Sequence, residues 1–371
     1  MQGAWPLANP FTAVNRAISE LRRGAVVLVT GGDGSAALVQ AAEYATDESV
    51  ESLGHATGGT LLLALTARRA RVLGLSQAEE GSIALSLPRG FSAGAIRALA
   101  DPAASLPSAM EAPAQASPGA EGSYWSGAVE LARAARLLPA ALLAPGHPAM
   151  LEGVAKDRDI YRVRARDVHD FRASGGGELQ VVGDASVPLA DSESTRIVAF
   201  RPADGGKEHL AIVIGEPRLD RPVLIRLHSE CFTGDLLGSL RCDCGEQLRG
   251  AIEAISAEGA GILLYLAQEG RGIGLVNKLR AYDLQDRGAD TVEANELLGF
   301  DPDERIYRPA TEMLRALGVR SVRLMTNNPL KVEALSGAGV TIAERVPHVF
   351  ASNTHNEAYL KTKARKSGHL F

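Results

Sequence analysis

The sequence predicts an α/β (α+β) fold divided into two domains. In both halves of the 371-residue chain, short apolar runs of strand type alternate with segments of helical spacing. Ser-Gly-Gly-Gly at 174–177 interrupts this alternation near the middle of the chain. A chain of this length is also typical of two or three domains. We therefore expect α/β domains over 1–172 and 182–371, a linker over 173–181, and a mixed sheet with helices in the second domain.

The composition indicates an ordinary globular protein, with 46% hydrophobic and 22% charged residues. A net charge of −5 gives no sign of nucleic-acid or membrane binding. There is no apolar run long enough for a transmembrane helix, and the N-terminus lacks the pattern of a secretory signal. Free thiols suit a reducing compartment. We expect a cytoplasmic protein with neither nucleic acid nor a membrane as partner.

The N-terminal half begins with a helix that leads into a buried strand. Apolar residues recur at helical spacing from Val14 to Leu21, Gly24 ends the helix, and 25–29 is a strand. Gly-Gly-Asp-Gly at 31–34 lacks the spacing of phosphate-binding loops, so we expect a plain turn. The further expected elements are a helix at 48–54, a strand at 60–65, a helix near 92–100, a flexible segment at about 101–122, a helix at 126–136, a strand at 140–143 and a structured region at 154–171.

Strands and helices alternate again in the C-terminal half. Expected strands are 196–200, 209–215, 223–227, 261–267 and 322–325, and expected helices are 245–258, 275–286 and one that ends near Leu335. Functional side chains of such domains lie in the loops at strand ends. This places His228 and Glu230 after one strand and the loop 268–271 after another.

All three cysteines of the chain, Cys231, Cys242 and Cys244, lie in one segment. Cys242 and Cys244 are poorly spaced for a mutual disulfide, whereas three clustered thiolates suit zinc. Three protein ligands with an open position are typical of catalytic zinc, which activates a bound water. Two alternatives stay open from the spacing alone: His228 as a fourth ligand of a structural site, and three unrelated core thiols.

The cysteine segment, 226–247, resembles the signature of GTP cyclohydrolase II, the first enzyme of riboflavin synthesis. Further family motifs follow in the family's order: Gln-Glu-Gly-Arg-Gly-Ile-Gly-Leu at 268–275, Asp-Thr-Val-Glu-Ala-Asn at 290–295, Asp-Glu-Arg at 303–305 and Thr-Asn-Asn-Pro at 326–329. The resemblance covers about residues 182–370. It implies a homodimer with one zinc ion per subunit that hydrolyses GTP to 2,5-diamino-6-(5-phosphoribosylamino)pyrimidin-4(3H)-one, formate and pyrophosphate.

The resemblance also implies roles for single residues. Arg305 matches the arginine proposed to attack the α-phosphate, Asp303 matches its proton acceptor, and Tyr282 matches an active-site position. Zinc would be held by Cys231, Cys242 and Cys244. The residues implied to bind GTP are Arg226, Leu227, His228, Ser229, Glu230, Gln247, Glu269, Gly270, Arg271, Thr291, Thr326 and Lys331.

The chemistry of these residues fits a nucleotide. Arginine, lysine and threonine side chains suit a triphosphate, and magnesium usually accompanies pyrophosphate. Gln247, Glu269 and Glu230 could pair with the guanine edge. Taken singly, Arg271 could be a solvated charge, Lys331 could cover a helix, and 303–305 could be a surface ion-pair cluster.

The N-terminal half resembles 3,4-dihydroxy-2-butanone 4-phosphate synthase in its opening helix and strand, in His-Ala-Thr-Gly at 55–58 and in residues 129–140. That enzyme needs an acidic cluster after its first strand, where this chain has only Asp33. Its Gly-His-Thr-Glu motif is replaced by Gly-Ser-Tyr-Trp-Ser-Gly at 122–127. We therefore expect a degenerate, folded domain without synthase activity.

Two alternative functions follow from the same residues. The chain could be a bifunctional riboflavin enzyme with both activities, which the missing acidic cluster disfavours. It could also be a non-catalytic GTP-binding regulator, which the intact cysteines, Asp303 and Arg305 disfavour. The basic stretch at 362–369 is expected to be a solvated end without an assigned role.

Overall fold

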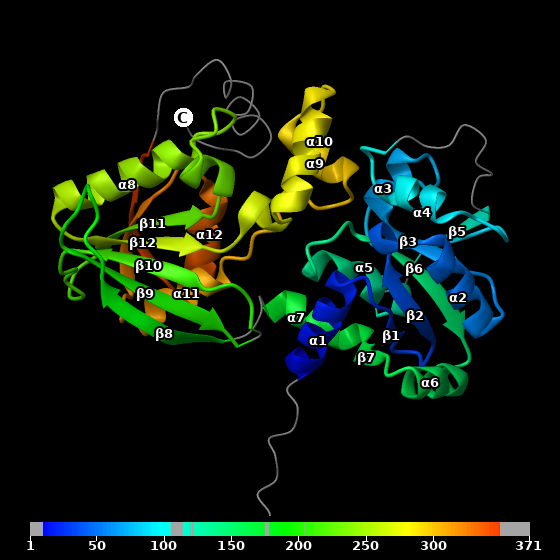
Figure 1. The fold of residues 1–371 in the computed structure, drawn as a ribbon. Coiled ribbons are helices and arrows are strands. Elements are labelled where there is room, and N and C mark those ends of the chain that lie inside the picture. The colour runs from blue at the N-terminus through cyan, green and yellow to red at the C-terminus, as the bar shows by residue number, and fades with distance from the viewer. Residues whose placement is uncertain are drawn as a thin grey trace, which may run out of the picture. The chain divides into compact units, whose positions relative to one another are not determined.

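The computed structural model describes residues 10–104, 114–118, 120, 122–174, 178–203 and 205–348. The expected basic end at 362–369 and the centres of the expected flexible segment and linker lie outside these residues. The chain divides into two compact units (Figure 1). The N-terminal unit comprises 1–174, 276–289 and 293–303, and the C-terminal unit comprises 175–275, 290–292 and 304–371. The domain limits expected from the sequence stay a prediction.

The N-terminal unit is built on a mostly antiparallel sheet with the order β5-β4-β3-β6-β2-β1-β7. Only the neighbouring pair β1 and β7 is parallel among its described strands. The strands are β1 (Val27–Thr30), β2 (Ala36–Ala41), β3 (Leu62–Thr66), β4 (Ser82–Ser86), β5 (Ala114–Pro118), β6 (Ala140–Gly146) and β7 (Tyr161–Arg164).

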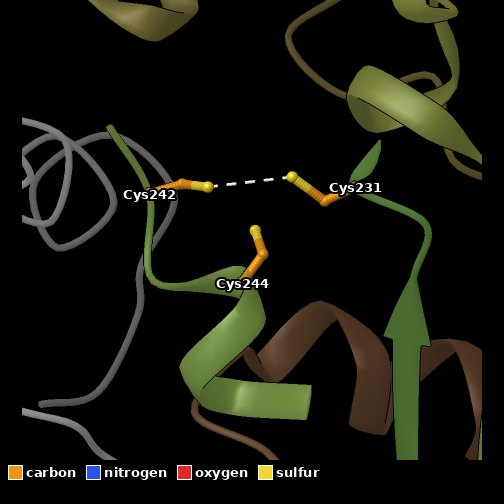
Figure 2. Close-up of side chains that lie close together, drawn as sticks. All are labelled: Cys231, Cys242 and Cys244. Carbon is orange, nitrogen blue, oxygen red and sulfur yellow. Dashed lines mark hydrogen bonds between the residues drawn. The ribbon is translucent and has the colours of Figure 1, made fainter. Parts of the chain in front are cut away.

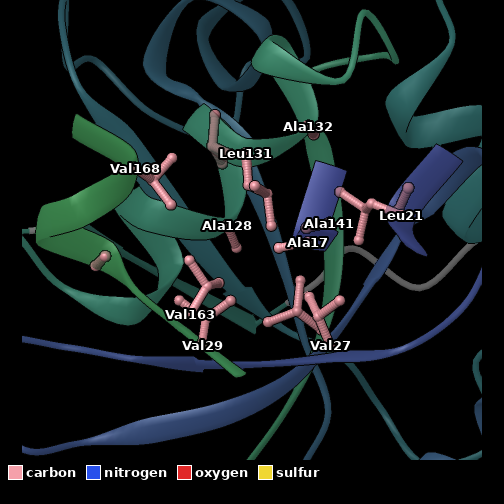
Figure 3. Packing of buried hydrophobic residues seen from close by; sticks show 14 of the residues in the cluster. Ala17, Leu21, Val27, Val29, Ala128, Leu131, Ala132, Ala141, Val163 and Val168 are labelled. Carbon is pink, nitrogen blue, oxygen red and sulfur yellow. The ribbon is translucent and has the colours of Figure 1, made fainter. Parts of the chain in front are cut away.

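Helices cover this sheet on its apolar faces. They are α1 (Pro10–Arg22), α2 (Asp47–Thr57), α3 (Ala67–Val72), α4 (Ala93–Ala100), α5 (Tyr124–Ala134), α6 (Pro148–Asp157) and α7 (Ala165–Ser174). One core forms where α1, α5 and α7 pack on the sheet (Figure 3); it includes Ala17, Leu21, Val27, Val29, Ala128, Leu131, Ala141 and Val168. Alternate strand residues such as Leu28, Leu38 and Leu142 are also buried, so both faces are covered.

Two further helices, α9 (Leu275–Asp286) and α10 (Thr291–Leu297), come from later in the chain, and most of their residues belong to the N-terminal unit. The sequence pattern predicts these residues as part of the second domain, 182–371. Ala281, Leu284, Ala294, Leu298 and Phe300 are buried there. The unit is therefore assembled from three separate stretches of sequence.

The C-terminal unit contains the expected mixed sheet, with the order β14-β13-β11-β12-β10-β9-β8. The strand pairs β11–β12, β11–β13 and β13–β14 are parallel, and the others are antiparallel. The strands are β8 (Leu179–Ser186), β9 (Thr195–Pro202), β10 (His209–Ile214), β11 (Val223–Ser229), β12 (Gly261–Leu266), β13 (Ser321–Met325) and β14 (Thr341–Val346).

The interior strand β11 packs against a different core on each of its two faces. Val223, Ile225 and Leu227 pack in the core formed with α11 (Arg308–Ala316) and α12 (Pro329–Gly337). Leu224 packs in the opposite core with α8 (Cys244–Glu258). Because side chains alternate along a strand, Arg226 and His228 share the α8 face with Leu224. This alternation directs two predicted site residues toward the start of α8.

Several elements were not predicted. β5 lies inside 101–122, which composition had indicated to be a flexible loop, because its backbone pairs with β4. β2 is rich in alanine and β8 is almost wholly exposed, so neither has the apolar alternation of a half-buried strand. Within the described ranges, none of the helices has the length and apolarity required to cross a bilayer.

Candidate active site

The three cysteines converge in the C-terminal unit (Figure 2). Cys231 follows β11 and precedes a π-helical turn, η2 (Phe232–Leu236), whereas Cys242 and Cys244 lie at the start of α8. The sulfur atoms of Cys231 and Cys242 are 3.7 Å apart, and all three sulfurs lie within 4.8 Å of one another. Zinc with sulfur bonds of about 2.3 Å in a tetrahedron would separate its ligands by about 3.8 Å. The spacing of the sulfurs therefore fits a zinc ion.

Hydrogen bonding within the cluster and burial raise the pKa of two of the thiols, those of Cys242 and Cys244. Hydrogen bonding to Cys231, together with burial, raises the pKa of Cys242 to about 11. Hydrogen bonds to Cys231 and Cys242, with burial, raise the pKa of Cys244 well above its usual value. Three adjacent thiolates are unfavourable in a buried place unless a cation neutralises them. A divalent metal would supply that charge, so the sulfur cluster has the chemistry of a metal centre.

Asp235 organises the surroundings of Cys231. Its Oδ2 accepts hydrogen bonds from the backbone N–H of Cys231 and from the hydroxyl of Tyr265, both at 2.9 Å. Its Oδ1 lies 3.0 Å from Nε2 of His228, and the ring of His228 stacks on that of Tyr265 with centroids 5.5 Å apart. Sequence reasoning missed Asp235 and Tyr265. Their only sequence signal is position: Asp235 falls four residues after Cys231, and Tyr265 pairs with His228 across the sheet.

His228 is directed toward Asp235 rather than into the sulfur cluster. Burial lowers the pKa of His228, so its imidazole is neutral and Nε2 can donate its proton to the carboxylate. Among the described residues, the one group with metal-ligating geometry contains the three cysteines and excludes His228. Within the described residues, the cluster thus offers three sulfur ligands to a metal.

Arg226 is buried close to the sulfur cluster. Its Nη1 donates to the carbonyl of Met325 at 2.9 Å, and its Nη2 donates to the side-chain oxygen of Gln247. Gln247 in turn donates to Asp243. Desolvation lowers the pKa of Arg226 to about 10, which still leaves it cationic at neutral pH. A second buried cation, Lys331, donates to the carbonyl of Leu227 at 2.8 Å.

The loop after β12 is held by Glu269, which is 2% exposed. One of its carboxylate oxygens accepts from the backbone N–H of Phe232 at 2.6 Å, and the other accepts from Gly270 at 2.8 Å. Gly270 and Arg271 have φ of 63° and 60°, the left-handed region that costs free energy for arginine. The carbonyl of Arg271 accepts from the N–H of Glu304 at 3.0 Å. Glu269 thus connects Phe232, which follows Cys231, to the loop 268–271 that is predicted to bind the nucleotide.

The other predicted site residues lie in both units. Thr326 is buried and its hydroxyl accepts from the N–H of Asn328 at 3.0 Å, while Arg305 lies 5.8 Å from the ring centroid of Tyr307. Thr291, the first residue of α10, also belongs to the C-terminal unit. The two that belong to the N-terminal unit are Tyr282, whose ring centroid is 5.7 Å from Nζ of Lys278, and Asp303.

Comparisons with known proteins identify the family of this chain. The family model described as GTP cyclohydrolase II matches residues 180–347. A GTP cyclohydrolase-2 of Azospirillum brasilense is 54% identical over 97% of this chain and 94% of its own length. The chain belongs to the GTP cyclohydrolase II family. One of Xylella fastidiosa is 38% identical over 95% of this chain and 86% of its own.

Relatives of this family also match the N-terminal half. The riboflavin biosynthesis protein RibBA of Phocaeicola vulgatus is 37% identical over 97% of each chain. The solved structure of RibBX, a two-domain 3,4-dihydroxy-2-butanone 4-phosphate synthase from A. baumannii, covers 90% of this chain and 99% of its own, with 18% identity and a TM-score of 0.34. The identity to RibBA extends through the N-terminal half, so family relatives share both halves of this chain.

Four polar atoms of residues in β11 or just after β11 and β12 are buried without a hydrogen-bond partner within the described residues. They are Nε of Arg226, Oγ of Ser229, Oε2 of Glu230 and Oε1 of Gln268. The two strands are neighbours in parallel, so their ends meet at one edge of the sheet. Buried polar atoms without partners cost about 1–3 kcal/mol each. A polar ligand at these strand ends would satisfy such atoms.

Proposed function

We propose that this chain is a zinc-dependent GTP cyclohydrolase II. It hydrolyses GTP to 2,5-diamino-6-(5-phosphoribosylamino)pyrimidin-4(3H)-one, formate and pyrophosphate, as the first step of riboflavin biosynthesis. The observation that carries the proposal is the cluster of Cys231, Cys242 and Cys244, whose sulfurs lie within 4.8 Å of one another and which no fourth ligating side chain joins among the described residues. Three ligands and an open position are the pattern of a hydrolytic zinc site.

The three cysteine sulfurs would hold the metal. A bound zinc ion would supply water activated near neutral pH, which hydrolysis at C8 of the purine requires because that carbon is a weak electrophile. The chain contributes the geometry: Asp235 fixes the backbone of Cys231, and Glu269 fixes that of Phe232. Both contacts hold the loop that carries the first sulfur ligand, which is how residues around a metal set its ligand positions.

GTP would be recognised at the edge where β11 and β12 end. The carboxylate oxygen Oε2 of Glu230 and Oε1 of Gln268 are buried acceptors without partners in the described chain, and guanine carries N–H donors on its pairing edge. The buried cations Arg226 and Lys331 give the neighbourhood a positive charge suited to phosphate. Magnesium on the pyrophosphate stays a prediction based on that charge.

The release of pyrophosphate stays a prediction from the family resemblance. In it, a guanidinium nitrogen of Arg305 bonds to the α-phosphorus, the bond to the β-phosphate oxygen breaks, and Asp303 accepts the guanidinium proton. Water then cleaves the phosphorus–nitrogen bond and restores the arginine. A base is required because a guanidinium is otherwise protonated.

The test is a turnover assay of the full zinc-loaded chain with GTP, in which formate and pyrophosphate are measured separately. The native chain should release both. Cys242→Ser should lose formate release, because serine is a poor zinc ligand. A folded, zinc-replete native chain that binds GTP and releases neither product would refute the enzyme and favour the non-catalytic GTP-binding regulator.

The N-terminal half is proposed to lack synthase activity. Asp33 lies in the turn between β1 and β2, where its Oδ1 accepts from the N–H of Ser35 at 2.9 Å and from the Ser35 hydroxyl at 2.5 Å. Asp33 is the only carboxylate of this turn, and its Oδ1 accepts both hydrogen bonds from Ser35 of the same loop. The full chain should not convert ribulose 5-phosphate, and clear turnover would establish the bifunctional alternative. A homodimer and a cytoplasmic location likewise stay predictions.

A further inference from the structure

Part of the segment matched by the GTP cyclohydrolase II model belongs to the N-terminal unit. Residues 276–289 and 293–303, called here the shared segment, include most of α9 and α10 and the stretch that leads to Asp303. The segment carries Tyr282 and Asp303, two residues of the predicted catalytic set. Part of the predicted catalytic set therefore lies in the same unit as residues 1–174.

Side chains and backbone of the N-terminal half hold the beginning of the shared segment. Asn277 is fully buried, and its Nδ2 donates to the carbonyl of Arg136 at 3.0 Å. Arg280, one helical turn later, pairs with Glu43 and with Asp101, both at 3.4 Å. These partners come from three different places in the N-terminal half. They fix both the position and the rotation of α9.

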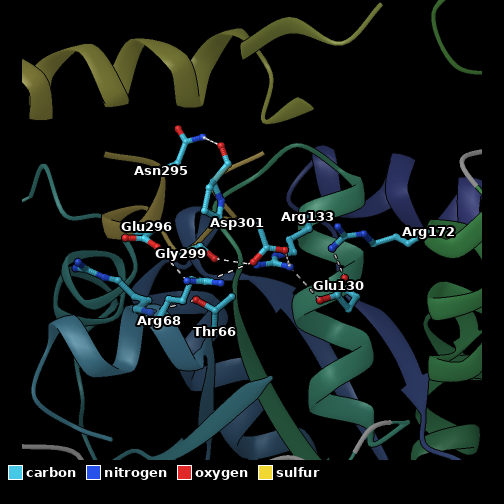
Figure 4. A network of polar contacts seen from close by, with 11 residues as sticks. Thr66, Arg68, Glu130, Arg133, Arg172, Asn295, Glu296, Gly299 and Asp301 are labelled. Carbon is cyan, nitrogen blue, oxygen red and sulfur yellow. Dashed lines mark hydrogen bonds and ion pairs between the residues drawn. The ribbon is translucent and has the colours of Figure 1, made fainter. Parts of the chain in front are cut away.

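Two arginines hold the end of the shared segment (Figure 4). Arg68 of α3 pairs with Glu296 at 3.0 Å and with Asp301 at 3.3 Å. Arg133 of α5 donates to the carbonyl of Gly299 at 3.1 Å and pairs with the other oxygen of Asp301 at 3.4 Å. The side chain of Arg133 is only 10% exposed and that of Asp301 is 43% exposed, so solvent screens their ion pair only in part.

Gly299 shows how closely the shared segment approaches the N-terminal half. Its φ is +88°, and a Cβ there would lie 2.8 Å from Oγ1 of Thr66 and 3.0 Å from Cγ of Pro139. A third arginine, Arg69, donates to the carbonyl of Leu297 at 3.4 Å. Backbone atoms as well as side chains are thus held at several successive residues. Such contacts define the path of the chain rather than only the docking of a helix.

We propose that Arg68 and Arg133 are positioning residues for the cyclohydrolase reaction. By fixing Asp301 they set the path of the chain that places Asp303, two residues later, for proton transfer. The N-terminal half therefore acts as a rigid support for part of the catalytic set. This inference rests on the proposed function, and it assigns to the degenerate domain a role in turnover.

The test compares Arg133→Ala and Arg133→Lys with the native full chain. Hydrogen exchange of peptides from 296–303 and from 223–258 is measured by mass spectrometry, together with kcat and KM for GTP. A matched control is Arg162→Ala, which removes an ion pair of the same unit, with Glu152 at 2.6 Å, that does not involve the shared segment. Zinc content is measured for every variant.

We expect Arg133→Ala to accelerate exchange in 296–303 but not in 223–258. It should lower kcat about 10- to 100-fold, because small misplacements of catalytic groups have effects of that size. KM and zinc content should change little. Arg133→Lys, which keeps the charge facing Asp301, should recover part of kcat, and Arg162→Ala should behave as the native chain does.

Unchanged exchange in 296–303 would show that Arg133 does not hold the segment. Faster exchange with an unchanged kcat would show that the held path is irrelevant to turnover, and a loss shared with Arg162→Ala would indicate general destabilisation. Each of these results would overturn the inference. A native chain that does not turn over GTP would instead refute the proposed function, and the exchange data would still decide whether Arg133 holds the segment.

Discussion

The carbonyl oxygen of Gly234 lies too close to the backbone of Gly245 for a Cβ to fit on Gly245. A Cβ on Gly234 itself would lie 2.8 Å from the sulfur of Cys242 and 3.0 Å from that of Cys231. The two glycines therefore let the turn after Cys231 and the start of α8 approach closely enough to bring the sulfurs together. Neither needs a positive φ, so close approach explains why both are glycine.

Gly234→Ala should disrupt the sulfur cluster, because its methyl group would collide with two of the three ligands. We expect a loss of most bound zinc and of formate release, measured by atomic emission and by product assay. Gly337→Ala is the control, since a Cβ at Gly337 would meet nothing within 4 Å. If Gly234→Ala bound one zinc ion per chain and kept the native distances between the sulfur atoms, the proposed steric collision would be wrong.

Asp235→Asn should weaken zinc binding. The carboxylate accepts from Cys231, Tyr265 and His228, and an amide can accept at only one of its two positions. Losing a residue that orients a metal ligand typically costs about 10- to 100-fold in affinity. Competition with a chelator measures the affinity. Asp220→Asn, at an exposed ion pair with Arg218, is the control; equal affinity of both variants would contradict the role of Asp235.

Glu230→Gln should reduce the selectivity for guanine. The buried Oε2 of Glu230 can accept from a guanine N–H, and the amide would present a donor in one of its two orientations. We expect kcat/KM for GTP to fall about 10- to 100-fold, mainly through KM, with a smaller fall for ITP, which lacks the 2-amino group. Glu208→Gln, at an exposed pair with Arg201, should have no effect. If Glu230→Gln left the ratio of kcat/KM for GTP to kcat/KM for ITP unchanged, Glu230 would not be the residue that recognises the guanine ring.

His348 should make folding stability depend on pH. Its Nε2 lies 3.0 Å from the carbonyl of Gln247, and burial, with the charge of Arg226, lowers its pKa to about 4 from the usual 6.5. The unfolded chain therefore takes up the proton at higher pH than the folded chain does. Its contribution to stability is complete above pH 6.5 and is lost as the pH falls toward 4.

Chemical denaturation between pH 7 and 4 measures this effect. His348→Gln, which keeps a donor for Gln247, should lose about 1–2 kcal/mol less stability over that range than the native chain. Comparison with the variant separates His348 from the carboxylates that titrate in the same range. Parallel stability curves for the two proteins would show that His348 does not titrate as inferred.

Much of the site could be predicted because its residues have local signals. The apolar run before Arg226 and His228 predicts a strand, and the spacing of the cysteines predicts a metal. Asp235, Tyr265 and Gly234 could not be predicted, because their roles arise only when η2, β12 and α8 meet.

The sequence pattern also could not predict that α9 and α10 belong mostly to the N-terminal unit. Asp301 and Arg133 are 168 residues apart, and an ion pair between distant residues leaves no periodic signal. The amphipathic pattern of a helix shows that one face is buried but not which part of the chain covers it. Exposed strands such as β8 were missed for a related reason, since they have no buried face to detect.

The most direct test of the zinc site is a titration of the metal-free full chain with zinc, in which bound zinc and formate release from GTP are measured together. We predict that formate release rises in proportion to bound zinc and saturates at one zinc ion per chain, and that Cys242→Ser shows neither tight binding nor formate release. Full formate release from the metal-free chain, or from Cys242→Ser, would contradict the assignment of ring opening to a zinc ion held by Cys231, Cys242 and Cys244.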